Sequence, residues 1–269
     1  MRFIQLGNGG GLDPTATNSS FLVQVKEDEY LLFDCGFNVM QKLIELQEES
    51  LQNNEYFHIS KIKYVFISHI HDDHVGNVET LMYWNYFKNN VSITWLYANE
   101  EVKDYLKMKM EPKLYNGGKV DNYSIVQSSI RSVSGDNKFP YRITRPEGGM
   151  LNSSTTIKLV SLYETFHGGC ESNGLVIIKE FDNGDSIEKT SFVISGDTKA
   201  SVYLEEEILY KTSNSSRTII YHDFSDWNCP SKNVHACKSD IDSEYSEEFI
   251  ESLIWYHNNG VFNRRWQDW

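Results

Sequence analysis

The hexapeptide His69-Ile70-His71-Asp72-Asp73-His74 concentrates side chains that can bind metal ions. It holds three imidazoles and two carboxylates, and it directly follows the β-like run 64–68. Imidazole and carboxylate ligands together suit zinc or a similar transition ion. On a tight turn, the spacing His-x-His-x-Asp-His lets His69 and His71 face one metal ion while Asp73 and His74 face a second. The alternative interpretation is a solvated polar loop, and the ordered polar residues downstream argue against it.

Candidate polar residues recur directly after runs that are typical of β-strands. These residues are Asp34, His167, Asp197, His222 and Asp223. Strand ends on one edge of a layered fold are the place where loops can converge on a site. Each residue alone is a weak signal, but the repeated position after a strand indicates one shared functional site.

The strands that must position these residues are recognisable as short apolar runs, interleaved with helical patterns. The runs lie at Phe3–Leu6, Phe21–Val25, Tyr30–Phe33, Tyr64–Ile67, Ser92–Tyr97, Thr156–Tyr163, Leu175–Ile178, Ser191–Ile194 and Thr218–Tyr221. Apolar residues recur at helical spacing after Gly36, from Val78 onward and over Tyr245–Leu253, and Asn183-Gly184 indicates a hairpin. This order predicts an α/β fold with two packed sheets covered by outer helices. We expect a single domain over residues 1–269, with an irregular insertion at about 112–152.

The net charge of −13, from 25 Lys and Arg against 38 Asp and Glu, limits the partners of the chain. A negative field opposes the approach of a long polyanion, because phosphate contacts dominate nucleic-acid affinity. The segment from Lys103 to Arg145 is a local exception, with nine basic and four acidic residues. It could contact phosphate, although a solvated surface insertion is the simpler interpretation.

Two further features bear on the site and on the compartment. The glycine-rich segment Gly7–Gly11 follows the first apolar run, where its backbone could approach phosphate, but a tight turn explains it more simply. No signal peptide and no membrane span is expected. Four cysteines without a CxxC pair, Cys35, Cys170, Cys229 and Cys237, favour free thiols and a cytoplasmic location.

The ordered motifs resemble those of the metallo-β-lactamase superfamily. The resemblance rests on His69–His74, Phe166-His167-Gly168, Ser195-Gly196-Asp197, a C-terminal histidine, and Asp34 within Leu32–Gly36. It covers nearly the whole chain and implies an αββα sandwich with a dinuclear metal site at the sheet edge. It further implies that His69, His71 and His167 bind the first metal ion, that Asp73, His74 and a late histidine bind the second, and that Asp197 bridges both. Asp34 would then orient a ligand.

The late histidine could be His222 or His235. The segments 221–225 and 233–236 resemble the tRNase Z branch of the superfamily, in which a histidine-acid motif precedes the last ligand. This resemblance implies that His235 is the ligand and that His222 is a proton donor to the leaving group. The alternative for His222 is a hydrogen-bonded residue beside Asp223. His58 and His257 match no motif and are expected to be surface or core residues.

A compact acidic chain with these motifs is similar to cyclic nucleotide phosphodiesterases of the anti-Pycsar type. That similarity implies a homodimer that converts 3′,5′-cyclic mononucleotides to nucleoside 5′-monophosphates and counteracts Pycsar anti-phage signalling, in the host cytoplasm if the protein is phage-encoded. Asp73 and His222 would be catalytic, and the cofactors would be two divalent metal ions, Zn²⁺ or alternatively Mn²⁺.

Other functions are compatible with the same motifs. The first alternative is a tRNase Z-like tRNA 3′-processing endonuclease, for which tRNA would be the partner. Hydrolysis of a lactone, thioester or β-lactam is a second alternative. A non-enzymatic protein that sequesters its ligand is a third.

Overall fold

The computed structural model divides the chain into two compact units, which are described separately. Unit 1 comprises Met1–Ser134 and Asn259–Asp268, and unit 2 comprises Gly135–Asn258 and Trp269. The residues described are 2–11, 13, 15–53, 57–89, 95–114, 130–132, 141–146, 154–162, 165–182, 184–224, 235–257 and 265–269.

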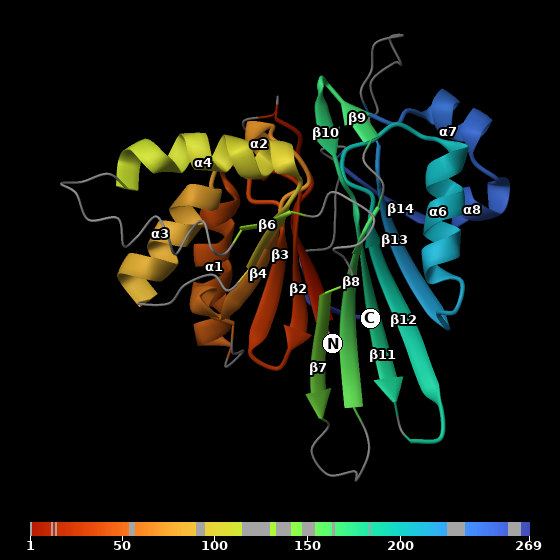
Figure 1. Cartoon of the computed structure of the whole chain (residues 1–269), viewed down its shortest axis with the longest axis horizontal. Coiled ribbons are helices and arrows are strands. Elements are labelled where there is room, and N and C mark those ends of the chain that lie inside the picture. Colours follow the sequence, from red (N-terminus) through yellow and green to blue (C-terminus); the bar gives the residue numbers. More distant parts are fainter. Residues whose placement is uncertain are drawn as a thin grey trace. The chain divides into compact units, whose positions relative to one another are not determined.

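Unit 1 is built on a seven-stranded sheet in the order β15-β1-β2-β3-β4-β5-β6 (Figure 1). Its strands are β1 (Arg2–Gly7), β2 (Ser20–Lys26), β3 (Glu29–Phe33), β4 (Ile62–Phe66), β5 (Trp95–Ala98), β6 (Ile130–Ser132) and β15 (Gln267–Asp268). Strands β1 to β3 pair antiparallel, whereas β3 to β6 pair parallel. Apart from Glu29 and Lys63, the residues of the parallel strands β3 and β4 are buried on both faces, which explains why they are apolar or aromatic.

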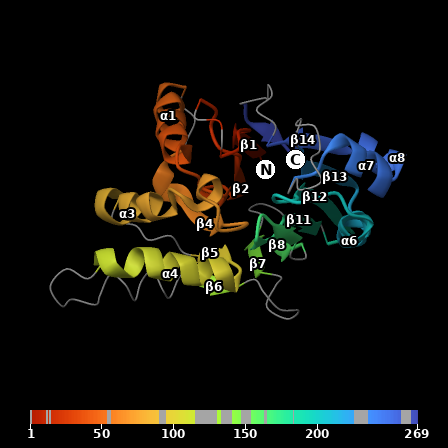
Figure 2. The same ribbon diagram turned by 90° about the horizontal axis from the view of Figure 1, so that it is seen from above.

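Helices cover one face of the sheet in unit 1. They are α1 (Val39–Gln52), η1 (Ile59–Lys61), α2 (Asp72–Val75), α3 (Val78–Asn89) and α4 (Glu100–Leu114), and Figure 2 shows α1, α3 and α4 on the same side of their strands. Buried residues of α1 such as Val39 and Leu43 pack with Leu32 and Val65 of the strands. The C-terminal strand β15 extends this sheet by pairing with β1, and Trp266 packs against Tyr30.

Unit 2 contains a six-stranded sheet in the order β14-β13-β12-β11-β8-β7 and a separate two-stranded hairpin. The sheet strands are β7 (Tyr141–Pro146), β8 (Ser154–Ser161), β11 (Leu175–Asp182), β12 (Ile187–Ile194), β13 (Arg217–Asp223) and β14 (Leu253–Tyr256), and the hairpin consists of β9 (Thr165–His167) and β10 (Cys170–Ser172). The helices are α6 (Val202–Thr212), α7 (Lys238–Glu244) and α8 (Glu247–Glu251). They form the connections between β12, β13 and β14, which pair parallel.

The sequence predicted most of these elements correctly. Each of the nine apolar runs overlaps a strand, and the predicted β11–β12 hairpin has Gly184 at φ +90°, which favours glycine. The helix predicted over Tyr245–Leu253 is wrong in its last part, because α8 ends at Glu251 and Leu253 begins β14. Most of the predicted insertion at 112–152 lies outside the described residues; its described parts are the end of α4, β6 and β7.

The expectations about membrane spans and about free cysteines have different outcomes. Among the described residues, no helix is long and apolar enough to cross a membrane. Cys35 and Cys170 are free thiols as expected. Cys237 is disulfide-bonded, which contradicts the expectation of a free thiol at that position, and Cys229 lies outside the described residues.

Candidate metal centre

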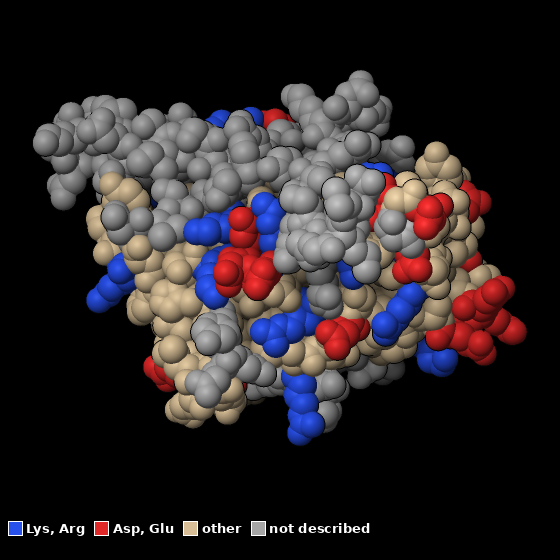
Figure 3. All heavy atoms as spheres, turned by 90° about the horizontal axis from the view of Figure 1, so that it is seen from below, with Lys and Arg blue, Asp and Glu red and all other residues tan. Residues whose placement is uncertain are grey.

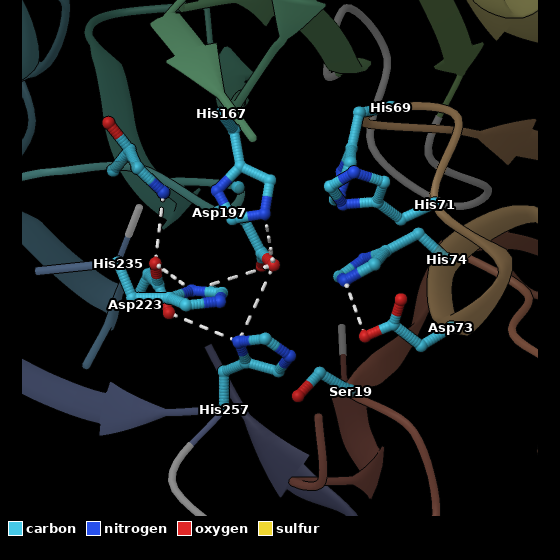
Figure 4. A network of polar contacts seen from close by, with 12 residues as sticks. Ser19, His69, His71, Asp73, His74, His167, Asp197, Asp223, His235 and His257 are labelled. Carbon is cyan, nitrogen blue, oxygen red and sulfur yellow. Dashed lines mark hydrogen bonds and ion pairs between the residues drawn. The ribbon is translucent and has the colours of Figure 1, made fainter. Parts of the chain in front are cut away.

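In unit 1, the histidine-rich turn follows the end of β4 and leads into α2. The side chains of His69 and His74 are buried, and Asp73 retains 13% exposure. His69 Nε2 lies 3.0 Å from His71 Nδ1, and His74 Nε2 lies 3.4 Å from Asp73 Oδ2 (Figure 4). The rings of His69 and His74 are also close, with their centroids 4.1 Å apart, so the turn gathers all four potential ligands in one place. Which of them share a metal ion stays a prediction.

Asp34 supports this turn from the end of β3. Its buried carboxylate accepts hydrogen bonds from Ser68 N at 2.7 Å, Ser68 Oγ at 2.8 Å and His74 Nδ1 at 2.7 Å. Burial raises the pKa of Asp34, and its contact with His74 opposes that shift. Because His74 Nδ1 is held by Asp34, the imidazole is oriented with Nε2 as its remaining ligand atom. This is the orienting role that the resemblance implied for Asp34.

In unit 2, Asp197 is surrounded by three imidazoles. It follows β12 in a turn where Gly196 adopts φ +71°, and it is 1% exposed. Its Oδ2 lies 3.6 Å from His167 Nε2, 3.7 Å from His235 Nδ1 and 3.5 Å from His257 Nδ1 (Figure 4). These separations exceed those of good hydrogen bonds. They are close to the about 3.3 Å expected between two ligands that each lie 2.0 Å from a tetrahedral ion.

Asp223 forms the second carboxylate of this cluster. It is fully buried, accepts hydrogen bonds from Thr198 N at 2.9 Å and His235 Nδ1 at 2.9 Å, and lies 3.3 Å from His257 Nδ1. Burial disfavours the charged form of Asp223, but His235 and His257 hold its pKa below the usual value. Burial likewise opposes protonation of His235, yet the Asp223 and Asp197 carboxylates raise the pKa of His235. The result is a hydrogen-bonded His–Asp pair.

His222 lies next to Asp223 in β13, but adjacent residues of a strand point to opposite faces. His222 is fully buried, its Nδ1 donates to the backbone oxygen of Asp223 at 2.7 Å, and its Nε2 accepts from the Tyr245 hydroxyl at 2.7 Å. Burial lowers the pKa of His222. Both ring nitrogens of a neutral imidazole are thus engaged, as in the hydrogen-bonded alternative considered for this residue.

His257 is the residue that sequence reasoning missed. It directly follows β14, adopts φ +65°, and its side chain is 5% exposed beside Asp197 and Asp223. The run Leu253–Tyr256 before it repeats the strand-then-polar-residue pattern of the other site residues. No strand is predicted there from the sequence, because the predicted helix extends to Leu253. His58, by contrast, accepts a hydrogen bond from Ser60 N at the start of η1, a local structural role.

Each unit thus gathers one set of potential metal ligands. Unit 1 brings together the predicted residues His69, His71, Asp73 and His74, with His74 held by Asp34. Unit 2 brings together the predicted residues His167, Asp197 and His235, and adds Asp223 and His257. The ligand atoms of Asp197, Asp223, His235 and His257 all lie within 4.8 Å of one another. The imidazole and carboxylate donors of both sets fit zinc or manganese.

Comparisons with known proteins give a family, sequence relatives and structural neighbours. Residues 1–265 match the family described as anti-Pycsar protein Apyc1. A ribonuclease Z of Methanosarcina mazei is 23% identical, and the alignment covers 96% of this chain and 87% of the relative. A ribonuclease Z of Methanosarcina acetivorans is 21% identical with the same coverage.

Among solved structures, the short form of human tRNase Z matches with a TM-score of 0.61 and 14% identity, covering 100% of this chain and 99% of that one. Yeast PDE1 matches with a TM-score of 0.57 and 12% identity over 98% and 89% of the two chains. The metallo-β-lactamase fold protein YhfI of Bacillus subtilis matches with a TM-score of 0.55 and 16% identity over 96% and 86%. These similarities confirm the metallo-β-lactamase fold.

Proposed function

Because the chain belongs to the anti-Pycsar Apyc1 family, in the tRNase Z-like branch of the metallo-β-lactamase superfamily, we propose that it hydrolyses 3′,5′-cyclic mononucleotides to nucleoside 5′-monophosphates. The match over residues 1–265 carries this proposal. It supports a metal-dependent phosphodiesterase of this fold, and the cyclic nucleotide substrate is our further assignment. The family description supports a role against Pycsar anti-phage signalling, which we also propose. A homodimeric state is proposed only because the resemblance implies it.

The ligand sets suit two divalent ions, and we assign them as the resemblance implies. His69, His71 and His167 would hold one ion, Asp73 and His74 would hold the other, and Asp197 would be a ligand of both. Zn²⁺ is the proposed metal and Mn²⁺ the alternative. Two such ions supply a nucleophile at neutral pH and neutralise charge that develops on the phosphoryl group.

For the late histidine, the geometry of unit 2 favours a change of assignment. His235 and His257 lie at similar distances from Asp197, but only His235 makes a 2.9 Å hydrogen bond to Asp223 and keeps 21% side-chain exposure. Its raised pKa suits a proton donor. We therefore propose His257 as the ligand of the second ion, His235 as the general acid, and Asp223 as the group that orients His235.

His222 then has a positioning role. Its hydrogen bonds to the backbone of β13 and to Tyr245 help to hold the strand that carries Asp223. The assignment of His222 as proton donor and His235 as ligand, which the resemblance implied, is the competing proposal.

The reaction follows from these roles. A water oxygen bonds to phosphorus as the bond from phosphorus to the 3′-oxygen breaks. Asp73 orients this water and accepts its proton, and His235 donates a proton to the departing 3′-oxygen. The product keeps its phosphate on the 5′-oxygen, so it is the nucleoside 5′-monophosphate.

Charge supports a small substrate over a long polyanion. The net charge is −13, and on the face drawn in Figure 3 the Lys and Arg side chains of the described residues are interspersed with Asp and Glu. Such a surface offers little attraction to many consecutive phosphates. The second candidate function is tRNA 3′ processing, which is favoured by the two ribonuclease Z relatives whose alignments cover 96% of this chain.

Metal removal tests the reaction class. Protein stripped with a chelator is expected to lose all turnover of cyclic AMP, GMP, CMP and UMP, because nucleophile and charge stabilisation both depend on the ions. Adding Zn²⁺ or Mn²⁺ should restore turnover, with chromatography showing only the 5′-monophosphate. Addition of Ca²⁺ is the matched control, since imidazole-rich sites favour transition ions. Absence of turnover with every nucleotide and both metals would refute the proposal.

A further inference from the structure

The glycine-rich loop at Gly7–Gly11 lies against the Asp73 side chain of unit 1. Backbone hydrogen bonds fix the loop to the segment just before strand β2. Asn8 N and Gly9 N donate to Thr17 O at 3.1 and 2.8 Å, and Ser19 N donates to Gly9 O at 2.9 Å. A Cβ atom placed on Gly11 would lie 3.0 Å from Asp73 Cγ and 3.1 Å from each of its carboxylate oxygens. The bare backbone of Gly11 therefore borders the Asp73 carboxylate.

The backbone of Asp73 is confined as well. A Cβ on Gly36 would lie 1.9 Å from Asp73 O and 2.7 Å from Asn18 Oδ1. The Asn18 side chain is completely buried there, and neither of its polar atoms has a hydrogen-bond partner among the described residues. A buried amide without hydrogen-bond partners destabilises the fold. Buried polar groups that lack partners, like the Asn18 amide, concentrate at functional sites.

We propose that Gly11 is a positioning residue for the metal ligand Asp73: its missing side chain leaves the carboxylate in the place that metal binding requires. This inference rests on the proposed function, in which Asp73 binds the second ion. The φ of Gly11 lies outside the left-handed region, so alanine can adopt the same backbone. The backbone conformation therefore does not explain why position 11 is a glycine. The closeness of Asp73 explains it.

The size of the clash makes Gly11 a selective probe. Contacts of 3.0–3.1 Å require the neighbouring atoms to shift by a few tenths of an ångström, and the neighbour is the mobile end of a side chain. Such a shift costs the fold little, but metal–ligand distances tolerate only about 0.2 Å. Gly36 is unsuitable as a probe, because its added Cβ would collide with the backbone carbonyl of Asp73.

The test compares Gly11→Ala and Gly11→Val with Thr15→Ala. Thr15 is exposed four residues after Gly11, and its hydroxyl bonds only to Asp13 in the described structure, so Thr15→Ala perturbs the chain near the loop but away from Asp73. Chelator competition should show that Gly11→Ala weakens one of the two metal equivalents about tenfold and Gly11→Val more, on the scale of outer-shell substitutions. Thr15→Ala should bind both equivalents like the wild type. The melting temperature of the metal-free protein should be the same for all four proteins.

Wild-type affinity for both metal equivalents in Gly11→Val would overturn the role of Gly11. A fall in metal-free melting temperature that parallels the affinity loss would also overturn it, because Gly11 would then act through the fold. If the wild type binds two ions but hydrolyses no cyclic nucleotide, the substrate assignment fails while this comparison still decides the role of Gly11. If the wild-type protein binds fewer than two metal ions, both the role of Gly11 and the proposed function are refuted.

Discussion

Replacing Asp197 with asparagine is expected to abolish phosphodiester hydrolysis while leaving the protein folded. Asp197 is the carboxylate common to three imidazoles in unit 2, and we assign it to both metal ions. An amide of the same shape is a poor ligand for zinc, so both ions lose a donor. The loss of several kcal/mol of transition-state stabilisation corresponds to a decrease in kcat/KM of at least about 10³-fold.

The metal-free Asp197→Asn protein should have a melting temperature close to that of the metal-free wild type. Without metal, the Asp197 charge repels buried Asp223 but also attracts protonated His235. Removal of the charge relieves the repulsion and takes away the attraction, and the two effects offset each other. Added Zn²⁺ should raise the melting temperature of the wild type but not of the variant. Asp242→Asn, which removes an exposed partner of Lys238 on α7, is the control and should retain activity and metal binding. A variant Asp197→Asn with near wild-type kcat/KM would contradict the bridging role.

Substitution of His257 and of His235 by glutamine should have different consequences. His257→Gln is expected to lose metal by more than the about 10- to 100-fold that outer-shell changes cause, because a direct ligand is removed. His235→Gln should retain both ions and lose about 10²- to 10⁴-fold in turnover of cyclic nucleotides, the usual contribution of a general acid. The proton that His235 donates is needed only when the leaving group is poor, as the 3′-oxygen of a nucleotide is. A nitrophenyl phosphodiester should therefore be hydrolysed by His235→Gln at nearly the wild-type rate.

Metal content and the two substrates together distinguish the two assignments. His58→Gln serves as the control, since His58 caps the short helix η1. If His235→Gln loses a metal equivalent and His257→Gln does not, His235 is the ligand that the sequence indicated. In that case, His222→Gln should show the leaving-group dependence predicted above for His235→Gln.

The strands and the histidine turn were predictable because their signals are local. β3 and β4 are buried on both faces over most of their length, so all their residues except Glu29 and Lys63 are apolar or aromatic. The ligand types and spacing of His69–His74 indicate metal binding within one turn. The helical period over 245–253 was misleading, because the short helix α8 and the first residue of strand β14 share one run of apolar positions. That error also concealed His257, since its position after a strand was not recognised.

Other parts of the site depend on tertiary structure that no local pattern records. Asp223 and His235 form an ion pair although they lie on separate elements. Nothing in the sequence around His222 and Asp223 shows which of them is turned toward Asp197. The approach of Gly11 to Asp73 likewise joins two segments that are far apart in the chain, so the glycine-rich loop looked like an ordinary turn.

The central claim, a phosphodiesterase for small cyclic nucleotides, is tested most directly by measuring kcat/KM for 3′,5′-cyclic mononucleotides and for precursor tRNA in one metal-loaded preparation over a series of salt concentrations. We expect formation of nucleoside 5′-monophosphates with little dependence on salt and no cleavage of precursor tRNA. Cleavage of precursor tRNA at its 3′ end, with binding that weakens steeply as salt increases, and no turnover of any cyclic nucleotide would contradict the account.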